Sequence, residues 1–361
     1  MIKTFKFRIY PSKSQRRKLD FSFDECLIVY NQLLCIRKQT YESSKKTVSR
    51  FDCNQLIGSW KDVIRPSLQK IHSQVLQQVS TRLDLAFKSF FKRCKTKNVK
   101  AGYPRYQKDN FSITYPQSGF TFKNGKLKLS KIGSLKIKLT RWFPEKIKTC
   151  TIKKSTTNKY YVCLTCEVEK NILSKTKKTI AFDLGIKSFL HTSENEVIEN
   201  PKYLNKKLKK LKNIQSQFSK SKSFKHKRKL RFLFEKIKNQ REDFLHKLST
   251  KIIKENDVII FEDLNIKSMM SSKNTNKNLN RNITDVSWSS FTNKLIYKAE
   301  NAGREVVKVN PANTSNTCSK CNIKHEIDLS VRSLPCCGID RDYNAALNIK
   351  ALGMQSLALV A

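Results

Sequence analysis

The sequence has few turn-forming residues and few acids. Its 361 residues include only 9 glycines and 8 prolines, which excludes collagen-like and Gly/Pro-rich low-complexity chains. The 29 acidic residues are too few to balance 73 lysines and arginines, so the formal net charge is +44. Apolar residues still make up 39% of the chain and aromatic residues 10%. That is enough for a packed core, so a disordered basic tail is excluded as well.

Long apolar runs and a regular cysteine framework are also missing. No stretch approaches the roughly 18 apolar residues that a transmembrane helix needs, and the N-terminus lacks the apolar segment of a signal peptide. Eleven cysteines, an odd number without fixed spacing, indicate a reducing compartment. The excess positive charge requires a polyanion as partner. Because basic and aromatic residues are interleaved along the whole chain, we expect nucleic acid rather than a membrane surface.

The first half of the chain predicts a β-rich module with inserted helices. Residues 1–10 alternate between apolar and polar positions, which predicts a strand. From residue 12 to about residue 98 the apolar residues recur every three or four positions, which predicts helices. Beyond these, Asn124-Gly125 lies between two alternating runs and predicts a hairpin. The expected β-barrel-like module comprises residues 1–11 and 102–170, with the helical residues 12–101 inserted between them.

The second half predicts an α/β domain that follows a Lys/Ser/Thr linker at residues 171–178. Leucines and isoleucines at helical spacing from residue 204 to residue 252 predict two amphipathic helices. Residues 206–231 contain twelve lysines and arginines and no acid. A solvated helix face is the ordinary interpretation of such a stretch, and the charge of the whole chain favours phosphate contact. Short apolar segments predict strands at residues 179–182, 187–192, 258–261 and 305–309.

Three acids stand where a metal-dependent nuclease would need them. Asp183 follows an apolar strand, and Gly185 after it permits a sharp turn. Glu262 closes another apolar strand, and Asp342 lies near the start of a predicted helix, where capping is its alternative role. Mg²⁺ prefers oxygen ligands, and cleavage with two metal ions requires carboxylates that converge from separate elements. The three acids together therefore predict a phosphodiester-cleaving site.

Six sequence blocks spread along the chain carry a family resemblance. Together they resemble TnpB, the OrfB-type protein of insertion sequences, which is related to Fanzor proteins and to type V CRISPR effectors. The blocks are Phe7-Arg8-Ile9-Tyr10-Pro11, Gly102-Tyr103-Pro104-Arg105, Asp183-Leu184-Gly185-Ile186-Lys187, Asn239-Gln240-Arg241, Phe261-Glu262-Asp263-Leu264-Asn265 and Asp340-Arg341-Asp342-Tyr343-Asn344-Ala345-Ala346.

The resemblance implies an α/β multidomain fold. Its parts would be a wedge-like β-barrel with an inserted helical recognition lobe, and a RuvC-like (RNase H-like) nuclease domain at residues 179–361 with a zinc-knuckle-like insertion at 312–338. The implied setting is the cytoplasm or nucleoid of a prokaryote, with a nuclear or viral context left open.

The resemblance also implies the activity. The chain would bind a guide RNA from the transposon end and cleave double-stranded target DNA next to a short flanking motif, with neither a membrane nor a small-molecule substrate involved. Asp183, Glu262 and Asp342 would bind two Mg²⁺ ions, and Asp340 is the alternative third acid. The alternative function is a nuclease-inactive, guide-RNA-dependent DNA-binding protein or a regulator of transposition.

A cysteine cluster departs from the family pattern. Cys318-x-x-Cys321 is half of a zinc knuckle, but its partner pair Cys336-Cys337 is adjacent rather than spaced by two residues. We expect adjacent cysteines to reach one ion only with a strained backbone, and His325 is an alternative fourth ligand. A structural Zn²⁺ held by Cys318, Cys321, Cys336 and Cys337 is the favoured interpretation. The shortened segment before Asp340 also puts the position of Asp342 in question.

The charge generates a first prediction. Because phosphates must neutralise most of the +44 charge, the affinity of the purified protein for RNA should fall steeply with salt. We expect log K against log[salt] to have a slope of about −0.9 per duplex phosphate contact and about −0.7 per single-strand contact. Filter binding between roughly 50 and 200 mM salt measures this slope. An affinity that stays constant over this range contradicts an interface dominated by phosphate.

Overall fold

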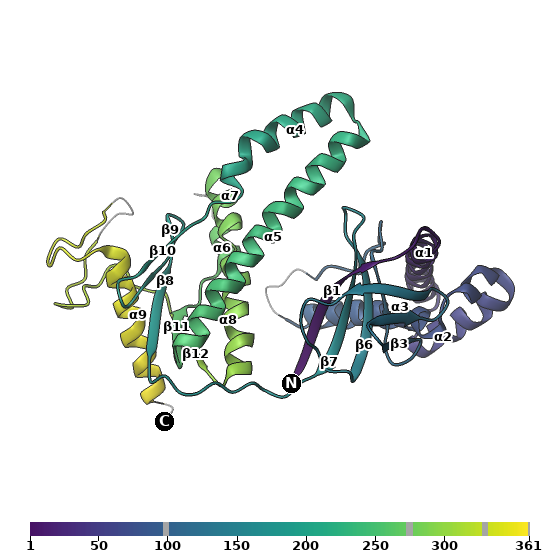
Figure 1. Ribbon diagram of the computed structural model, residues 1–361, viewed down its shortest axis with the longest axis horizontal. Coiled ribbons are helices and arrows are strands. Elements are labelled where there is room, and N and C mark those ends of the chain that lie inside the picture. Colours follow the sequence, from purple (N-terminus) through teal and green to yellow (C-terminus); the bar gives the residue numbers. More distant parts are fainter. Residues whose placement is uncertain (97–100, 272–276, 327–330, 360–361) are drawn as a thin grey trace. The chain divides into compact units, whose positions relative to one another are not determined.

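The computed structural model describes residues 1–96, 101–271, 277–326 and 331–359. The chain divides into two compact units, an N-terminal unit Met1–Glu169 and a C-terminal unit Lys170–Ala361. Figure 1 shows a β-sheet with helices in each of them. Within the described ranges, no helix is long and apolar enough to cross a membrane.

The N-terminal unit is built on a seven-stranded antiparallel sheet in the order β2-β6-β7-β1-β5-β4-β3. The predicted first strand is confirmed as β1, which pairs with β7 on one side and β5 on the other. Its alternation buries Phe5, Phe7 and Ile9 on one face. The strands are β1 (Ile2–Tyr10), β2 (Ser112–Tyr115), β3 (Phe120–Lys123), β4 (Lys126–Leu129), β5 (Gly133–Lys138), β6 (Ile147–Lys154) and β7 (Tyr160–Glu167).

The predicted hairpin is confirmed, whereas a closed barrel is not. Asn124 and Gly125 join β3 to β4 with φ angles of 51° and 69°, the left-handed conformations that a two-residue hairpin turn requires. Among the described strands, β2 hydrogen-bonds to β6 alone and β3 to β4 alone. These four-residue strands are therefore the two edges of the sheet, and the strands of the expected β-barrel-like module do not close into a barrel within the described residues.

The helices predicted between residues 12 and 98 are confirmed as far as Cys94, while residues 97 and 98 lie outside the described part of the chain. Ser12 begins the first helix with a capping box, in which its side chain and that of Gln15 each accept a backbone N–H. Leucines of these helices, including Leu33 and Leu76, share one hydrophobic core with the sheet. The helices are α1 (Lys13–Ser44), α2 (Arg50–Ser59), the π-helix η1 (Trp60–Ile64), the 3₁₀ helix η2 (Pro66–Lys70) and α3 (Ser73–Cys94).

The C-terminal unit contains a five-stranded mixed sheet in the order β10-β9-β8-β11-β12. Strands β8, β11 and β12 run parallel, and β9 and β10 are antiparallel to their neighbours. All four predicted strands are confirmed, while β10 is only three residues long and gave no sequence signal. The strands are β8 (Thr179–Leu184), β9 (Ser188–Thr192), β10 (Val197–Glu199), β11 (Val258–Glu262) and β12 (Glu305–Val309).

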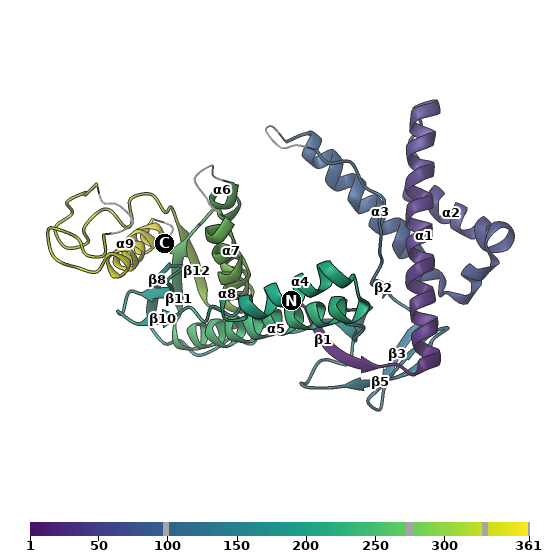
Figure 2. The ribbon, with the colours of Figure 1, turned by 90° about the horizontal axis from the view of Figure 1, so that it is seen from above.

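Helices cover both faces of this sheet, with α9 on one face and α5 and α8 on the other (Figures 1 and 2). The strand period of two explains the sorting, because Ile180 and Phe182 of β8 pack toward α5 and α8 while Ala181 packs in the cluster that contains Ile349 of α9. The elements are η3 (Asn205–Lys207), α4 (Leu208–Ser221), α5 (Phe224–Glu255), α6 (Ile266–Ser271), α7 (Lys277–Val286), α8 (Trp288–Ala302) and α9 (Arg341–Ala358).

The segment predicted as a linker is held against the C-terminal unit. The Asp257 carboxylate accepts the backbone N–H groups of Thr176 and Lys177 at 2.9 and 2.7 Å. Arg304 forms a buried ion pair with Asp257 and donates to the Ser174 carbonyl. The charge of Asp257 is thus satisfied by a guanidinium and by amide groups, which anchors the chain just before β8 begins.

The fold generates a second prediction, at the crossing of α9 over β11. A Cβ atom on Gly353 would lie 2.3 Å from Cγ2 of the buried Ile260. Gly353→Ala should therefore lower the free energy of unfolding by about 1–3 kcal/mol, despite the better helix propensity of alanine. Urea unfolding measures the change. Gly58→Ala in α2 is the matched control, since its Cβ meets nothing within 4 Å and the change should be neutral or stabilising.

Candidate active site and cysteine cluster

The strand register brings two of the predicted acids together. Phe182 of β8 lies opposite Phe261 of the parallel strand β11, so Asp183 and Glu262 follow at the carboxyl ends of neighbouring strands. The two phenylalanine rings stack at 5.7 Å on the face covered by α5 and α8. Because side chains alternate along a strand, both acids project to the opposite face, which α9 covers.

The third acid reaches the same place from α9. Asp342 lies in the first turn of this helix, and its side chain lines a cleft of about 680 Å³ together with Asp183. Asp340 is the N-cap residue of α9, and its Oδ1 accepts the N–H groups of Asp342 and Tyr343 at 2.9 and 3.0 Å. The helix N-terminus thus engages Oδ1 of Asp340, while Asp342 faces the cleft. Ligand atoms of Asp340, Asp342 and His191 also lie within 4.8 Å of one another, so the cap does not remove Asp340 from the reach of a metal ion.

Burial and like charge shape the electrostatics of these acids. Burial, followed by the charges of Glu262 and Asp342, raises the pKa of Asp183 to about 7. The N–H of Leu184 and the charge of Arg341 oppose this shift. Burial also raises the pKa of Glu262, against the Thr314 hydroxyl, which donates to Glu262 Oε1 at 2.6 Å. A cation bound beside the three carboxylates would therefore stabilise their charged forms.

Histidine 191 is a neighbour of this site that the sequence interpretation missed. It lies on β9 directly opposite Asp183, and it is 92% buried. Its Nδ1 is 3.6 Å from Asp340 Oδ1, its Nε2 is 2.9 Å from Asn195 Oδ1, and its ring stacks on Tyr343. The period of two across the β8–β9 turn was the signal that could have found it, because residues opposite each other share a face.

Cations surround the cleft on several sides. The acids Asp183 and Asp342 are joined there by Lys187 beyond β8, by Lys202 before α4, and by arginines that precede and begin α9. This mixture of carboxylates and cations suits a phosphodiester, whose charged oxygens need positive partners on each side of the reacting bond. The cationic side chains that line the cleft are Lys187, Lys202, Arg332 and Arg341.

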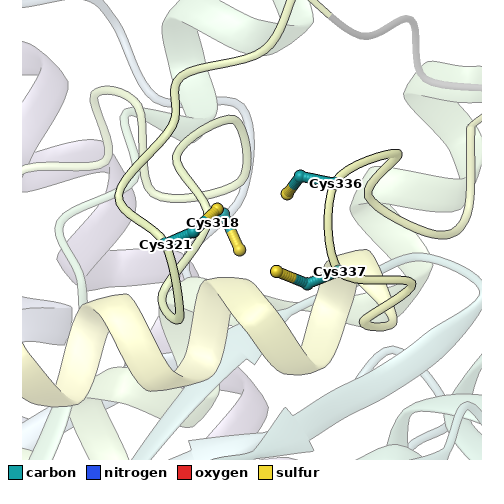
Figure 3. A group of neighbouring side chains, drawn as sticks. All are labelled: Cys318, Cys321, Cys336 and Cys337. Atoms are coloured by element: carbon teal, nitrogen blue, oxygen red, sulfur yellow. The ribbon is translucent and has the colours of Figure 1, made fainter.

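The four predicted zinc ligands are close together. Cys318 and Cys321 lie in a turn closed by the bridge between Thr317 and Lys324, and Cys336 and Cys337 lie in a second turn closed by the bridge between Ser333 and Asp340. Figure 3 shows the two pairs pointing toward each other from these facing turns. The four Sγ atoms all lie within 4.8 Å of one another. Cys336 and Cys337 therefore both reach the first pair although they are adjacent in sequence.

The backbone at the adjacent cysteines is not left-handed. Neither Cys336 nor Cys337 has a positive φ, and the left-handed residue of their turn is Gly338, at φ 62°. Backbone N–H groups of Cys321 and Lys320 lower the pKa of the Cys318 thiol to about 6. Thiolates are the ligands that Zn²⁺ prefers, and a site of this kind fits one. Within the described residues, His325 is not part of the group.

Comparisons with known families cover most of the chain. The OrfB_IS605 model, described as a "Probable transposase", matches residues 162–273, and the "Cas12f1-like, TNB domain" model matches residues 288–349. A third model, described as a helix-turn-helix domain of OrfB_IS605, matches residues 1–46. In this structure those residues contain the strand β1 and the single long helix α1.

Individual relatives are similar along almost the full length. A Streptomyces pristinaespiralis protein named as an RNA-guided DNA endonuclease is 32% identical over 99% of this chain and 90% of its own. The Escherichia coli protein InsQ, named likewise, is 29% identical over 99% of this chain and 94% of its own. A solved structure of a Cas12f1–sgRNA–target DNA complex shares the fold, with a TM-score of 0.59 at 16% identity over 97% of this chain and 98% of that one.

The raised pKa generates a third prediction, on stability. The folded chain keeps the Asp183 proton up to about pH 7, whereas the unfolded chain releases it near pH 3.8, so the stability of the metal-free protein falls as pH rises through this window. Asp183→Asn removes this loss of stability, because asparagine does not titrate. We expect the free energy of unfolding of the variant to exceed that of the parent by about 1–4 kcal/mol at pH 8 and to equal it below pH 4.

Thermal unfolding across this pH range, in buffer treated with chelator, measures the difference. Asp263→Asn is the matched control, because Asp263 is exposed at the end of the same sheet and pairs with Lys308 at the surface. It should change stability by less than about 1 kcal/mol. An Asp183→Asn variant that is less stable than the parent at pH 8 contradicts the raised pKa of Asp183.

Proposed function

This chain belongs to the TnpB family, and from that premise we propose that it cleaves double-stranded DNA at sites chosen by pairing with a bound guide RNA. It is a transposon-associated RNA-guided DNA nuclease by family. The observation that carries the proposal is the meeting of Asp183, Glu262 and Asp342 on one face of the sheet in the C-terminal unit. The alternative, a binder without nuclease activity, lacks a comparable observation because all three acids are present.

We propose roles for the parts of the chain on the same basis. Residues 179–361 would form the RuvC-like nuclease domain, which the five-stranded sheet with acids at the ends of β8 and β11 supports. Residues 1–11 and 102–170 would form the wedge-like module and residues 12–101 the recognition lobe. The guide RNA would come from the transposon end, and the cut would fall next to a short flanking motif.

The acids fit divalent metal. The three side chains are oxygen donors, and the pKa values of Asp183 and Glu262 are raised. Such a donor set suits Mg²⁺, which would neutralise charge and activate water when bound. Asp183, Glu262 and Asp342 would hold it. Lys187 and Arg341, which line the same cleft, would attract the phosphate backbone and orient the scissile phosphodiester toward the acids.

The helical hairpin α4–α5 supplies a second basic surface. Of the twelve lysines and arginines at residues 206–231, Lys207 and Arg231 are partly buried and the other ten are exposed. The hairpin is held together by its own apolar cluster, which includes Leu211, Ile214 and Leu233. The cations are therefore presented on a preformed surface, and we propose that they contact nucleic-acid phosphates.

The fourth prediction tests the acids. Asp183→Asn, Glu262→Gln and Asp342→Asn should each abolish cleavage of a guided plasmid library with randomised flanking motifs, with similar losses of at least about 100-fold, since residues that act as one unit are not additive. Asp340→Asn should retain cleavage, because its carboxylate caps α9 and an asparagine can also cap a helix.

Guide-RNA binding is the control for these variants, and it should be unchanged in all four because the basic surfaces are untouched. Cleavage that survives in Asp342→Asn and is lost in Asp340→Asn would assign the third acid to Asp340. A parent protein that binds guide and target but never cuts, with Mg²⁺ or Mn²⁺, would leave the binder as the function.

The fifth prediction concerns the cysteine cluster, which we propose holds one structural Zn²⁺. Elemental analysis should find about one zinc per chain, because four thiols lie within reach of a single tetrahedral ion. Cys337→Ser should lower that content, while Cys94→Ser, at an exposed cysteine in the N-terminal unit, should leave it unchanged. Less than a tenth of an equivalent in the parent would show that the shortened knuckle has no metal.

A further inference from the structure

A short segment after β12, which includes the first cysteine of the cluster, connects Glu262 to α9. This strap comprises residues 314–319. Its first residue, Thr314, is 97% buried, and its hydroxyl donates to Glu262 Oε1 at 2.6 Å. The Pro311 carbonyl lies 3.1 Å from the same hydroxyl. A hydroxyl has one proton, and an ionised carboxylate is the stronger acceptor, so the shorter contact takes it when Glu262 is charged.

That bond has a consequence for the second carboxylate oxygen. In the part of the chain that the structure describes, the side-chain hydrogen bond of Glu262 falls on Oε1. A hydrogen bond at one oxygen restricts the rotation of the carboxylate, which narrows the directions that Oε2 can take and leaves its lone pairs for a cation. A ligand held this way before the cation arrives loses less conformational freedom on binding.

The strap is itself fixed by the helix that carries Asp342. The fully buried Asn344 of α9 donates to the Thr317 carbonyl at 2.7 Å and accepts the Ser319 N–H at 2.7 Å. One turn later, Asn348 donates to the Thr314 and Thr317 carbonyls at 2.8 and 2.7 Å. These bonds clamp the strap on both sides of the buried Cys318. Thr314 therefore has a rigid support on α9.

We propose that Thr314 is a positioning residue for cleavage, which holds Glu262 in the orientation that binds the catalytic cation, with the strap and the two α9 asparagines as its support. This inference rests on the proposed role of Glu262 in metal binding. It goes further in naming a buried residue that is not an acid and that sets how tightly the acid site holds its metal.

The test compares two substitutions at one position. Thr314→Val keeps the shape of the side chain and removes the hydroxyl, and Thr314→Ser keeps the hydroxyl. A hydrogen bond to a charged group is worth a factor of roughly 10 to 100 in an equilibrium constant. Because this bond is present before the cation binds, only part of that factor acts on affinity. We expect Thr314→Val to weaken Mn²⁺ binding at the acid site by up to about 10-fold and to raise the Mg²⁺ concentration for half-maximal cleavage, and we expect Thr314→Ser to behave as the parent.

Mn²⁺ binding is followed by electron paramagnetic resonance of the free ion, on the full-length protein with its RNA. Glu262→Gln measures the Mn²⁺ that RNA and surface groups hold, which is subtracted. Thr292→Val is the matched control, because the Thr292 hydroxyl donates to a carbonyl within α8 on the opposite face of the sheet. It should leave Mn²⁺ affinity unchanged, and all the variants should bind guide RNA as the parent does.

The outcomes separate the two proposals. A Thr314→Val protein that folds, binds guide RNA and holds Mn²⁺ as tightly as the parent overturns the positioning role alone. Loss of Mn²⁺ affinity in Thr314→Val with rescue in Thr314→Ser supports it, since a merely structural threonine would move the unfolding temperature and not the metal affinity. A parent that neither holds Mn²⁺ at the acids nor cleaves overturns the proposed function, and the inference falls with it.

Discussion

Burial of carboxylates at the edge of an apolar sheet, with repulsion between them as a second effect, is the constraint that the C-terminal unit has to satisfy. Two of the acids continue strands whose other residues belong to the core, and burial with like charge raises the pKa of Asp183 to about 7. Such a cluster costs folding free energy while no cation is bound. Its position is therefore set by the elements beneath it rather than by attraction among its members.

Those elements hold the acids through backbone register and helix capping. The parallel ladder of β8 and β11 fixes the spacing of Asp183 and Glu262 at adjacent strand ends. The N-cap at Asp340 and the close approach of Gly353 to Ile260 fix where α9 starts and how near it lies. A change in either contact would move Asp342 although Asp342 itself is unchanged. Residues far from the cleft therefore help to set the position of this acid.

Local pattern predicts most of this fold, while the arrangement between elements is harder to read from sequence. Period-two alternation predicted the strand at residues 1–10, and Asn124-Gly125 predicted a hairpin whose φ angles match. Whether the β-barrel-like module closes was not readable from the sequence, because pairing of the two short edge strands depends on curvature that alternation does not encode. His191 and Thr314 were missed for a related reason, since each contacts an acidic residue through the register of a sheet or the path of a loop.

The net charge of the chain is positive, whereas the acid site is negative and has lysines and arginines beside it. A nucleic acid attracted by a net charge of +44 still meets three carboxylates at the point of chemistry, where its phosphates are repelled unless cations intervene. Lysines and arginines at the cleft supply part of that compensation, and the exposed cations of α4 and α5 lie on a separate hairpin. Affinity for the polyanion can thus be strong and independent of the acids, while reaction at the acids stays conditional on a bound divalent cation.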